Sequence, residues 1–320
     1  MRKIILLTVF LLGATYSFAA NAPAGDVKTG ETAVEAYSMP FTFRYGVGTV
    51  FPSVSMLIGK PNDRAVGKFT YEGNQPLVQT VTASLNGMGF SFSYDKFKGA
   101  KYVDSRFFTS GGHFGIDAIY QRYSGFSMSD PAGYSDPGVD CQNRPDMKIQ
   151  SFNSTVFVST APERFSYDAA LHQTAHQKAA GWSIFLGLSP AYSKLDASMP
   201  LVPAPDRQYY GREGGLKSGV FYSLAFSLGG GFAYAHGPLY TGFSGYFGLG
   251  PAGYSYRTAD RKESGVTYSI KGDLKYFVGL DWEHFFTGFV WIFDGSDYAL
   301  HDADFESTAH QLEFFAGSRF

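Results

Sequence analysis

The fold is decided by the last nine residues of the chain, Leu312-Glu313-Phe314-Phe315-Ala316-Gly317-Ser318-Arg319-Phe320. On an extended strand, Leu312, Phe314 and the terminal Phe320 share one face, as does Ala316, whereas Glu313 and Arg319 lie on the other. Soluble domains usually fray at their termini, but this alternation continues to the last residue. We interpret the segment as a strand of a membrane β-barrel, with an edge strand of a soluble sandwich as the alternative.

The other end of the chain predicts export. Arg2 and Lys3 precede an apolar run over residues 4–12, and small residues near Ser17 and Ala19 fit a signal-peptidase site. We expect a cleaved signal peptide over residues 1–20 and a short periplasmic segment over residues 21–40. No stretch is long and apolar enough to cross a bilayer as a helix. Since only helices and closed barrels satisfy their backbone hydrogen bonds in lipid, insertion is expected to use strands.

The composition favours a barrel over a soluble β protein. The net charge is −2 and the mean hydropathy is −0.12, yet aromatic residues make up 18% of the chain. A barrel shows lipid to one face of each strand and a polar lumen to the other, which reconciles low hydropathy with many aromatic residues. The near-neutral charge supplies no basic stripe, so no nucleic-acid partner is expected. The single cysteine, Cys141, excludes an internal disulfide.

Alternation with a period of two recurs along most of the chain and predicts an all-β fold. Phe41, Phe43 and Tyr45, for example, alternate with Thr42 and Arg44. We expect a single transmembrane antiparallel up-and-down barrel over residues 41–320, with about twelve strands. These strands are predicted over residues 41–51, 64–73, 77–95, 100–109, 113–123, 163–172, 180–191, 219–235, 239–250, 266–282, 285–294 and 309–320.

Two features leave the strand number open. Asn86-Gly87 is a strong hairpin signal that could divide residues 77–95 into two strands. Residues 151–159 could also pair, which would raise the number to fourteen.

Loop lengths predict the topology. An even number of strands places both termini on one side, which we expect to be the periplasm. The short connections then fall on that side, at residues 74–76, 110–112, 173–179, 236–238 and 283–284. The long connections fall outside, at residues 52–63, 124–162, 192–218, 251–265 and 295–308. Short periplasmic turns with longer external loops are typical of such barrels.

Charged residues on the face opposite the apolar one predict the character of the lumen. This inward set comprises Arg44, Arg106, Lys271, Lys275 and Arg319, together with Asp104, Asp117, Asp168, Asp273, Asp281 and Glu313. A pore selective for one sign of ion normally carries a ring of like charge. Nearly balanced charge instead favours ion pairs across a narrow or plugged lumen. For any single residue the alternative is simple filling of a wet interior, because a charge facing lipid costs roughly 2–4 kcal/mol.

No motif indicates catalysis, a cofactor or a metal. The chain lacks GxSxG, HExxH and CxxC, so we expect no enzyme. His172 and His176 would form a metal pair on a helix, but they fall at a predicted strand end and turn, where solvated side chains are expected. Asp302, Asp304 and Glu306 alternate like calcium ligands but lack the glycine and spacing of a known calcium loop.

Two segments resemble a known family. They are residues 114–128 (FGIDAIYQRYSGFSM) and residues 164–187 (RFSYDAALHQTAHQKAAGWSIFLG). The matching pieces are Tyr120-Gln121-Arg122-Tyr123 with Gly125-Phe126, Arg164-Phe165-Ser166-Tyr167 with Ala169-Ala170, and Gln177-Lys178 before Ala180-Gly181. They are similar to the outer-membrane barrels of Bacteroides-type bacteria catalogued as domain of unknown function 4421, in which serine usually replaces Ala180. The resemblance implies a compact outer-membrane barrel and no assigned activity.

Three functions follow, in order of preference. The first is small-solute channel activity through a narrow polar lumen, and the second is a structural or surface-binding barrel that acts through its external loops. An outer-membrane enzyme ranks last. The expected location is the outer membrane of a Gram-negative bacterium, and the expected partners are its lipid and the barrel assembly machinery. The strand that carries Leu312, Phe314 and Phe320 resembles the C-terminal strands that this machinery recognises.

We predict that deletion of Phe320 lowers barrel insertion severalfold, because the assembly machinery loses its terminal aromatic residue. Export stays intact, so the unfolded chain accumulates in the periplasm. The measurement is the amount of heat-modifiable folded protein in outer-membrane fractions, and an unchanged amount refutes the prediction.

Overall fold

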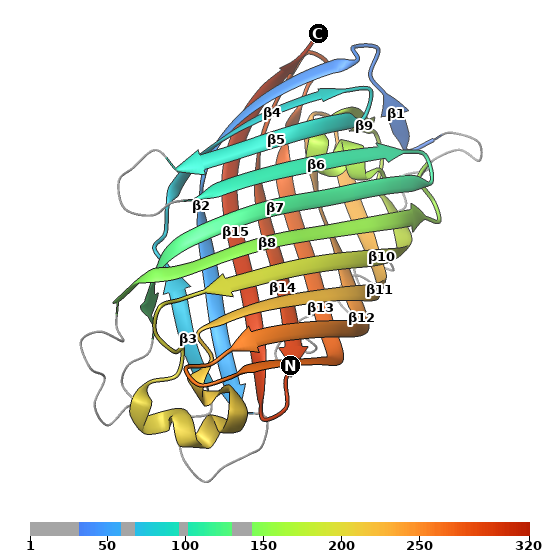
Figure 1. Ribbon diagram of the computed structural model, residues 1–320. Helices are drawn as coiled ribbons and strands as arrows, with labels where there is room; N and C mark the ends of the chain where they lie inside the picture. The colour runs from blue at the N-terminus through green and yellow to red at the C-terminus, as the bar shows by residue number, and fades with distance from the viewer. Residues whose placement is uncertain (1–31, 59–67, 96–101, 130–142) are drawn as a thin grey trace.

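The computed structural model describes residues 32–58, 68–95, 102–129 and 143–320 (Figure 1). The expected signal peptide and Cys141 lie outside these residues. Twelve antiparallel strands form a closed ring: β2 (Phe41–Ile58), β4 (Leu77–Leu85), β5 (Met88–Asp95), β6 (Val103–Gly111), β7 (Phe114–Met128), β8 (Asn143–Ser159), β10 (Gly181–Asp196), β11 (Ser218–His236), β12 (Leu239–Arg257), β13 (Lys262–Asp281), β14 (Phe285–Ala299) and β15 (Ala303–Arg319). The predicted antiparallel barrel of twelve strands is confirmed.

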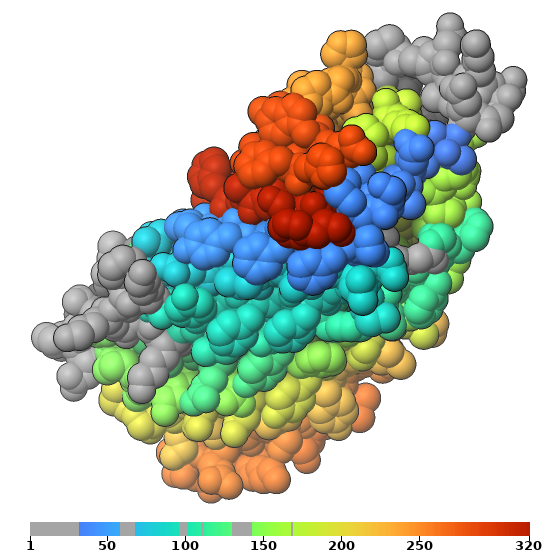
Figure 2. Space-filling view, turned by 90° about the horizontal axis from the view of Figure 1, so that it is seen from above, coloured from blue at the N-terminus to red at the C-terminus, as the bar shows by residue number. Residues whose placement is uncertain are grey.

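The ring closes between its first and last strands. β15 pairs with β2 from Arg319 opposite Thr42 to Ala303 opposite Ile58. Beyond the ladder, the N–H of Phe320 donates to the carbonyl of Phe41 over 2.9 Å. Figure 2 shows this seam from above, with the blue atoms of β2 against the red atoms of β15. The C-terminal strand is therefore the closing strand of the barrel. We call the end of the barrel that holds Phe41 and Phe320 the terminal end, and the opposite end the loop end.

A short strand, β3 (Lys68–Gly73), completes the wall near the loop end. It pairs with β2, Leu57 lying opposite Lys68, and on its other edge with β7, Tyr71 lying opposite Met128. β4 continues along β2 in the same direction, Leu77 lying opposite Thr49. The chain therefore runs along β2 through β3, residues 74–76 and β4 without reversing its direction. The prediction of residues 74–76 as a turn at the terminal end was wrong, because Pro76 breaks the ladder without reversing the chain.

The number of strands was correct although some predicted strands were not. Asn86 and Gly87 have φ angles of 50° and 76° and form a tight hairpin between β4 and β5, so residues 77–95 are two strands. Residues 151–159 belong to the long strand β8. Residues 163–172 are not a strand: they lie inside the barrel, where their alternating apolar residues pack against the inner wall. Because β3, predicted as a full strand within residues 64–73, is not counted among the twelve strands of the ring, these differences cancel in the total.

The outer surface of the barrel is apolar. Phe226 is 71% exposed and Phe314 is 68% exposed, and many other outward side chains of this kind follow each strand. Such a surface is unfavourable in water and matches the lipid-facing band of a transmembrane barrel. Within the part of the chain that the structure describes, no helix combines the length and the apolar character needed to cross a membrane.

A glycine allows the closing seam to pack tightly. Gly48 of β2 lies opposite Glu313 of β15, and a Cβ atom at this position would lie 2.0 Å from the carbonyl oxygen of Leu312. Gly48→Val is expected to lower the free energy of unfolding by about 1–3 kcal/mol through overpacking. The measurement is the urea midpoint of the barrel in lipid vesicles. The neighbouring Thr49→Val is the matched control, and equal stability of both variants would contradict the prediction.

Candidate functional site: the plugged lumen

The connection between β8 and β10, residues 160–180, folds into the lumen at the terminal end. It contains a single π-helical turn, η1 (Asp168–His172), and a short strand, β9 (Ala175–Gln177). β9 pairs antiparallel with β1 (Val34–Ala36) of the N-terminal segment. Figure 1 shows both short strands beside the wall at this end. We call residues 160–180 together with residues 33–37 the plug.

Aromatic packing seats the plug against the inner wall. Phe165 and Tyr167 of the plug are buried, with 1% and 4% of their surfaces exposed. They pack, with Leu171, among inward-facing residues of the wall that include Phe157, Phe185, Tyr246, Phe277 and Phe286. The inward aromatic residues of these strands therefore pack against the plug. Because they are apolar, the inward faces of these strands are less uniformly polar than expected.

A first group of charges joins the plug to the wall near the middle of the lumen. The ammonium group of Lys275 lies 2.7 Å from Asp273 Oδ1 and 3.0 Å from Asp117 Oδ2. It also donates to the hydroxyl of Tyr167 in the plug over 2.6 Å. The other oxygen of Asp117 lies 3.2 Å from Arg106 Nε. All three donors of Lys275 are therefore used, and two of them hold carboxylates of the wall.

A second group of charges, which we call the latch, consists of Tyr37, His176, Asp281 and Arg319. Arg319 Nη2 lies 2.7 Å from Asp281 Oδ1, and the guanidinium lies 3.7 Å from the centre of the Tyr37 ring. Asp281 Oδ2 accepts from the Tyr37 hydroxyl over 2.5 Å and lies 3.1 Å from His176 Nδ1. Burial raises the pKa of Tyr37 above its ordinary value, and Asp281 reinforces the shift. The hydroxyl therefore remains a donor, and the latch fixes both parts of the plug to β13 and β15.

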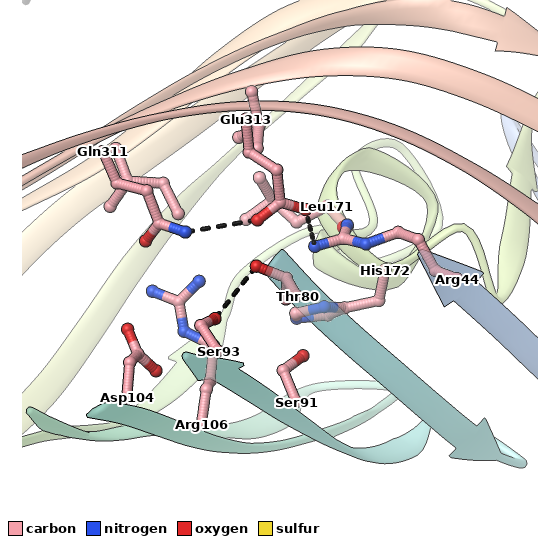
Figure 3. A pocket seen from close by; sticks show the side chains of 12 residues that line it. Arg44, Thr80, Ser91, Ser93, Asp104, Arg106, Leu171, His172, Gln311 and Glu313 are labelled. Atoms are coloured by element: carbon pink, nitrogen blue, oxygen red, sulfur yellow. Dashed lines mark hydrogen bonds and ion pairs between the residues drawn. The ribbon is translucent and has the colours of Figure 1, made fainter. Parts of the chain in front are cut away.

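Arg44 and Glu313 form a third link across the seam (Figure 3). Arg44 Nη2 donates to Glu313 Oε1 over 3.0 Å, and Arg44 Nη1 donates to the carbonyl of Leu171 in the plug over 3.0 Å. The ring of His172 stacks on Phe108 with 3.5 Å between centroids. His172 is only 7% exposed, so its prediction as a solvated turn residue was wrong: the π-helical turn carries it into the lumen.

Asp104 and Lys271 face the lumen as predicted but lie outside these three groups, whereas Asp168 does not lie on a strand of the wall. Asp104 accepts from the hydroxyl of Tyr102 over 2.8 Å. Lys271 is buried and, among the described residues, has no carboxylate oxygen within 4.0 Å. Asp168 lies in η1 and not on a strand. The structure therefore brings most of the predicted set together inside the barrel but removes Asp168 from the wall.

One inward acid was missed by the sequence analysis. Asp294 of β14 accepts from Asn153 Nδ2 across the lumen over 2.7 Å. Its neighbours on the inward face, Val290 and Ile292, are apolar, so simple alternation does not mark that face as polar. One signal in the sequence places Asp294 inward. Both faces of this strand are apolar, and a charge on the lipid-facing one would be costly.

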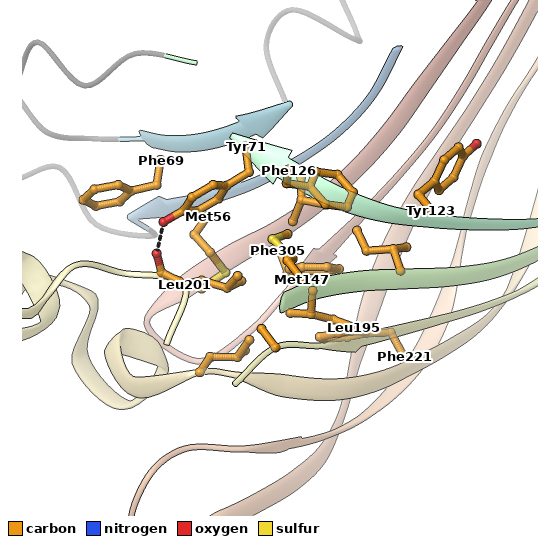
Figure 4. Packing of buried hydrophobic residues seen from close by; sticks show 14 of the residues in the cluster. Met56, Phe69, Tyr71, Tyr123, Phe126, Met147, Leu195, Leu201, Phe221 and Phe305 are labelled. Carbon is orange, nitrogen blue, oxygen red and sulfur yellow. Dashed lines mark hydrogen bonds between the residues drawn. The ribbon is translucent and has the colours of Figure 1, made fainter. Parts of the chain in front are cut away.

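The loop between β10 and β11, residues 197–217, closes the other end, and we call it the lid. It contains a 3-10 helical segment, η2 (Ala204–Gly215). Leu201, Val202 and Tyr210 of the lid are fully buried in an apolar cluster within the barrel mouth. Figure 4 shows Leu201 among inward residues of the wall such as Met56, Phe126 and Phe305. Part of the loop expected at residues 192–218 is therefore buried in the barrel mouth, and β10 extends to Asp196.

Polar contacts anchor the lid to its surroundings. Leu201 O accepts from the hydroxyl of Tyr71 over 2.6 Å. Glu213, which is fully buried, accepts from the Tyr256 hydroxyl over 2.9 Å and from the N–H of Asp302 over 3.1 Å. The N–H of Arg212 donates to the Asp302 carboxylate and holds its pKa below the ordinary value. Asp302, predicted to lie in an acidic external loop, is thus a contact of the lid.

The spaces left in the lumen are small. The cavity shown in Figure 3, lined by Arg44, Arg106 and Glu313, measures about 20 Å³. Two further cavities beside Asp294 measure about 20 Å³ and 10 Å³. Each has room for about one water molecule. A larger cavity of about 540 Å³ lies at the terminal end, between the plug and the wall around Phe157 and Phe185.

The latch generates a prediction on stability. Asp281→Leu leaves the charge of Arg319 buried without its partner and is expected to lower the free energy of unfolding by roughly 3–5 kcal/mol. Adding Arg319→Met removes that charge and is expected to recover most of the loss. The measurement is the urea midpoint in lipid vesicles, with Lys178→Gln, which removes an exposed partner of Glu35, as a control that changes the midpoint little. Additive losses in the double variant would contradict the prediction.

Several solved structures resemble this barrel in fold. The outer membrane protease OmpT from Escherichia coli aligns over 89% of this chain and 98% of its own, with 6% identity and a TM-score of 0.42. The Neisserial surface protein A aligns over 87% and 97%, with 6% identity and a TM-score of 0.27. The toluene transporter TodX from Pseudomonas putida aligns over 88% and 89%, with 6% identity and a TM-score of 0.27. Likeness at this level does not extend to an activity.

The sequence comparisons are more specific. No curated protein matches the chain in sequence. A family profile described as a domain of unknown function matches residues 67–320, which include both segments that carry the resemblance noted above. The chain therefore belongs to the family of the domain of unknown function DUF4421.

Proposed function

We propose that this protein is an outer-membrane barrel whose lumen is closed, and that it acts as a structural or surface-binding barrel. The single observation that supports this most strongly is that both ends of the lumen are filled, by the plug and by the lid. Between them, the cavities lined by the charged residues have room for about one water molecule each. A closed lumen favours the second of the functions expected from the sequence over the first.

The character of the lumen charges supports the same proposal. Arg44, Arg319 and Lys275 each contact a carboxylate of the wall and an atom of the plug. Breaking a buried pair by removing one partner costs roughly 3–5 kcal/mol. Displacing the plug would disturb several such links at once, so the plug is expected to remain in place under resting conditions.

The proposed location and partners rest on the outer surface. An apolar band on every side is suited to lipid, and the expected signal peptide directs the chain across the inner membrane. Phe320 is 66% exposed at the terminal end of the closing strand. This exposure would leave its ring accessible to the barrel assembly machinery, in agreement with the role expected from the sequence.

A gated small-solute channel is the second candidate, and the cavity of about 540 Å³ favours it. Its volume is typical of small-molecule sites, and its lining includes Phe165 and Tyr167 of the plug. A solute could enter there if the plug moved. Passage would then still require movement of the lid, since the two closures lie in series along the lumen.

We propose no enzymatic activity. The contact at the loop end that most resembles a catalytic pair joins His301 Nδ1 and Asp302 Oδ1 over 2.8 Å. Asp302 also accepts a hydrogen bond from the N–H of Arg212, so this pair helps to hold the lid. A protease or lipase assay on purified protein would overturn this proposal by showing turnover that His301→Ala abolishes.

Conductance in planar bilayers tests the closed state. We predict that the unmodified protein shows no steady conductance, and that replacing residues 163–178 by a short Gly-Ser linker leaves it silent because the lid still closes the lumen. Replacing residues 199–214 alone is also expected to leave it silent, whereas both replacements together open a conducting lumen.

Heat-modifiable mobility shows that each of these variants is folded. Steady conductance of the unmodified barrel would overturn the closed state. Conductance after removal of the plug alone would overturn the role of the lid and favour the gated channel.

A further inference from the structure

Aromatic residues form an outward-facing row that crosses β7, β8 and β10 and continues onto β11, where Tyr222 lies opposite Tyr192. Tyr120 of β7 lies opposite Phe152 of β8, which in turn lies opposite Tyr192 of β10. Their exposed fractions are 39%, 42% and 38%. Aromatic residues at such positions mark the boundary between the hydrocarbon and the polar headgroups.

Cations occupy the next outward positions toward the loop end. On β7 the residue after Tyr120 on this face is Arg122, and on β10 the residue after Tyr192 is Lys194. Both lie opposite Gln150 of β8, and Lys148 follows Gln150 on the same face. Arg122 and Lys148 are exposed and Lys194 is half-buried. The three cations therefore surround one polar position directly beyond the aromatic row.

These cations form no ion pair with the carboxylates that the structure describes. In residues 32–58, 68–95, 102–129 and 143–320, no carboxylate oxygen lies within 4.0 Å of the charged groups of Arg122, Lys148 or Lys194. Asp196 lies opposite Lys148 in the register of β8 and β10, yet the two form no ion pair in that part of the chain. By contrast, Lys68 at the same end of the barrel lies 2.8 Å from Glu306. A group of three cations that form no ion pair among the described residues is suited to an external anion.

The distance from the aromatic row indicates where that anion lies. Strands rise about 3.3 Å per residue, so Arg122 and Lys194 lie about 7 Å beyond the aromatic row and Lys148 lies about 13 Å beyond it. Lys and Arg side chains at a membrane boundary extend their charged ends toward the headgroups. Arginine also binds phosphate through two parallel hydrogen bonds. Charged ends at these positions are suited to lipid phosphates, and the aromatic row is suited to the apolar part of the same lipid.

We infer that Arg122, Lys148 and Lys194 bind the phosphate-bearing headgroup of a membrane lipid packed against β7, β8 and β10. The inference rests on the membrane location proposed above but not on the state of the lumen. A lipid is favoured over free phosphate because the aromatic row supplies an apolar contact that free phosphate cannot use.

The test uses the full-length folded barrel in detergent micelles and a bisphosphorylated glycolipid, lipid A, as the probe. Native mass spectrometry measures the bound fraction as the lipid concentration rises. The triple variant R122Q/K148Q/K194Q is expected to bind roughly 100-fold more weakly, on the basis of the usual contribution of each basic residue near anionic lipid. Lipid A stripped of its phosphates is expected to bind the unmodified protein as weakly.

A matched triple variant, K217Q/R257Q/K262Q, removes the same charge further toward the loop end, from Lys217 at the end of the lid, Arg257 of β12 and Lys262 of β13. It is expected to retain the affinity of the unmodified protein within about threefold, since attraction to headgroups falls off within a Debye length. Unchanged binding by the first variant, or equal losses in both, would overturn the inference. Full competition by millimolar inorganic phosphate would overturn the assignment to a lipid. Steady conductance of the unmodified barrel would contradict the proposed closed lumen and would leave this inference unchanged.

Discussion

The structure depends on one constraint: in lipid, every backbone N–H and carbonyl group must find its partner within the protein. Antiparallel pairing satisfies this requirement along the wall, but an open sheet would leave two edges unpaired. The ladder between β2 and β15 removes both edges. β3 meets the same requirement locally, because it fills the wall between β2 and β7 where β5 and β6 end early. Backbone hydrogen bonding alone thus requires a closed ring of strands.

Closure of the ring creates an interior that must then be filled. This barrel fills it with different chemistry at different levels. The lid supplies an apolar cluster at the loop end, whereas the plug combines aromatic packing with contacts to Lys275, Arg44 and Arg319. Buried charges are tolerated because each of these cations meets a carboxylate and a second acceptor. An interior of this kind explains the balanced inward charge better than a conducting pathway does.

Much of this arrangement could be predicted from alternation alone, and the failures have a physical cause. Alternation reports which side chains share a face, and it correctly separated Arg44 and Glu313 from the lipid-facing Phe43 and Phe314. It does not report what covers that face. Residues 163–172 alternate because they pack inside the barrel, and Asp294 was missed because its inward neighbours are apolar. Balanced inward charge favoured a narrow or plugged lumen, but the π-helical turn that buries His172 has no period-2 signal. Alternation therefore could not identify the segments that form the plug and the lid.

The latch has a consequence for the order of assembly. Tyr37 precedes the first strand of the ring, His176 lies midway along the chain, and Arg319 comes from the last strand. The four side chains can meet only after the whole chain has emerged and β15 has reached its place beside β2. The latch is therefore expected to form late, after the wall is complete. A chain that stopped before β15 would lack Arg319, and its plug would be held without the latch.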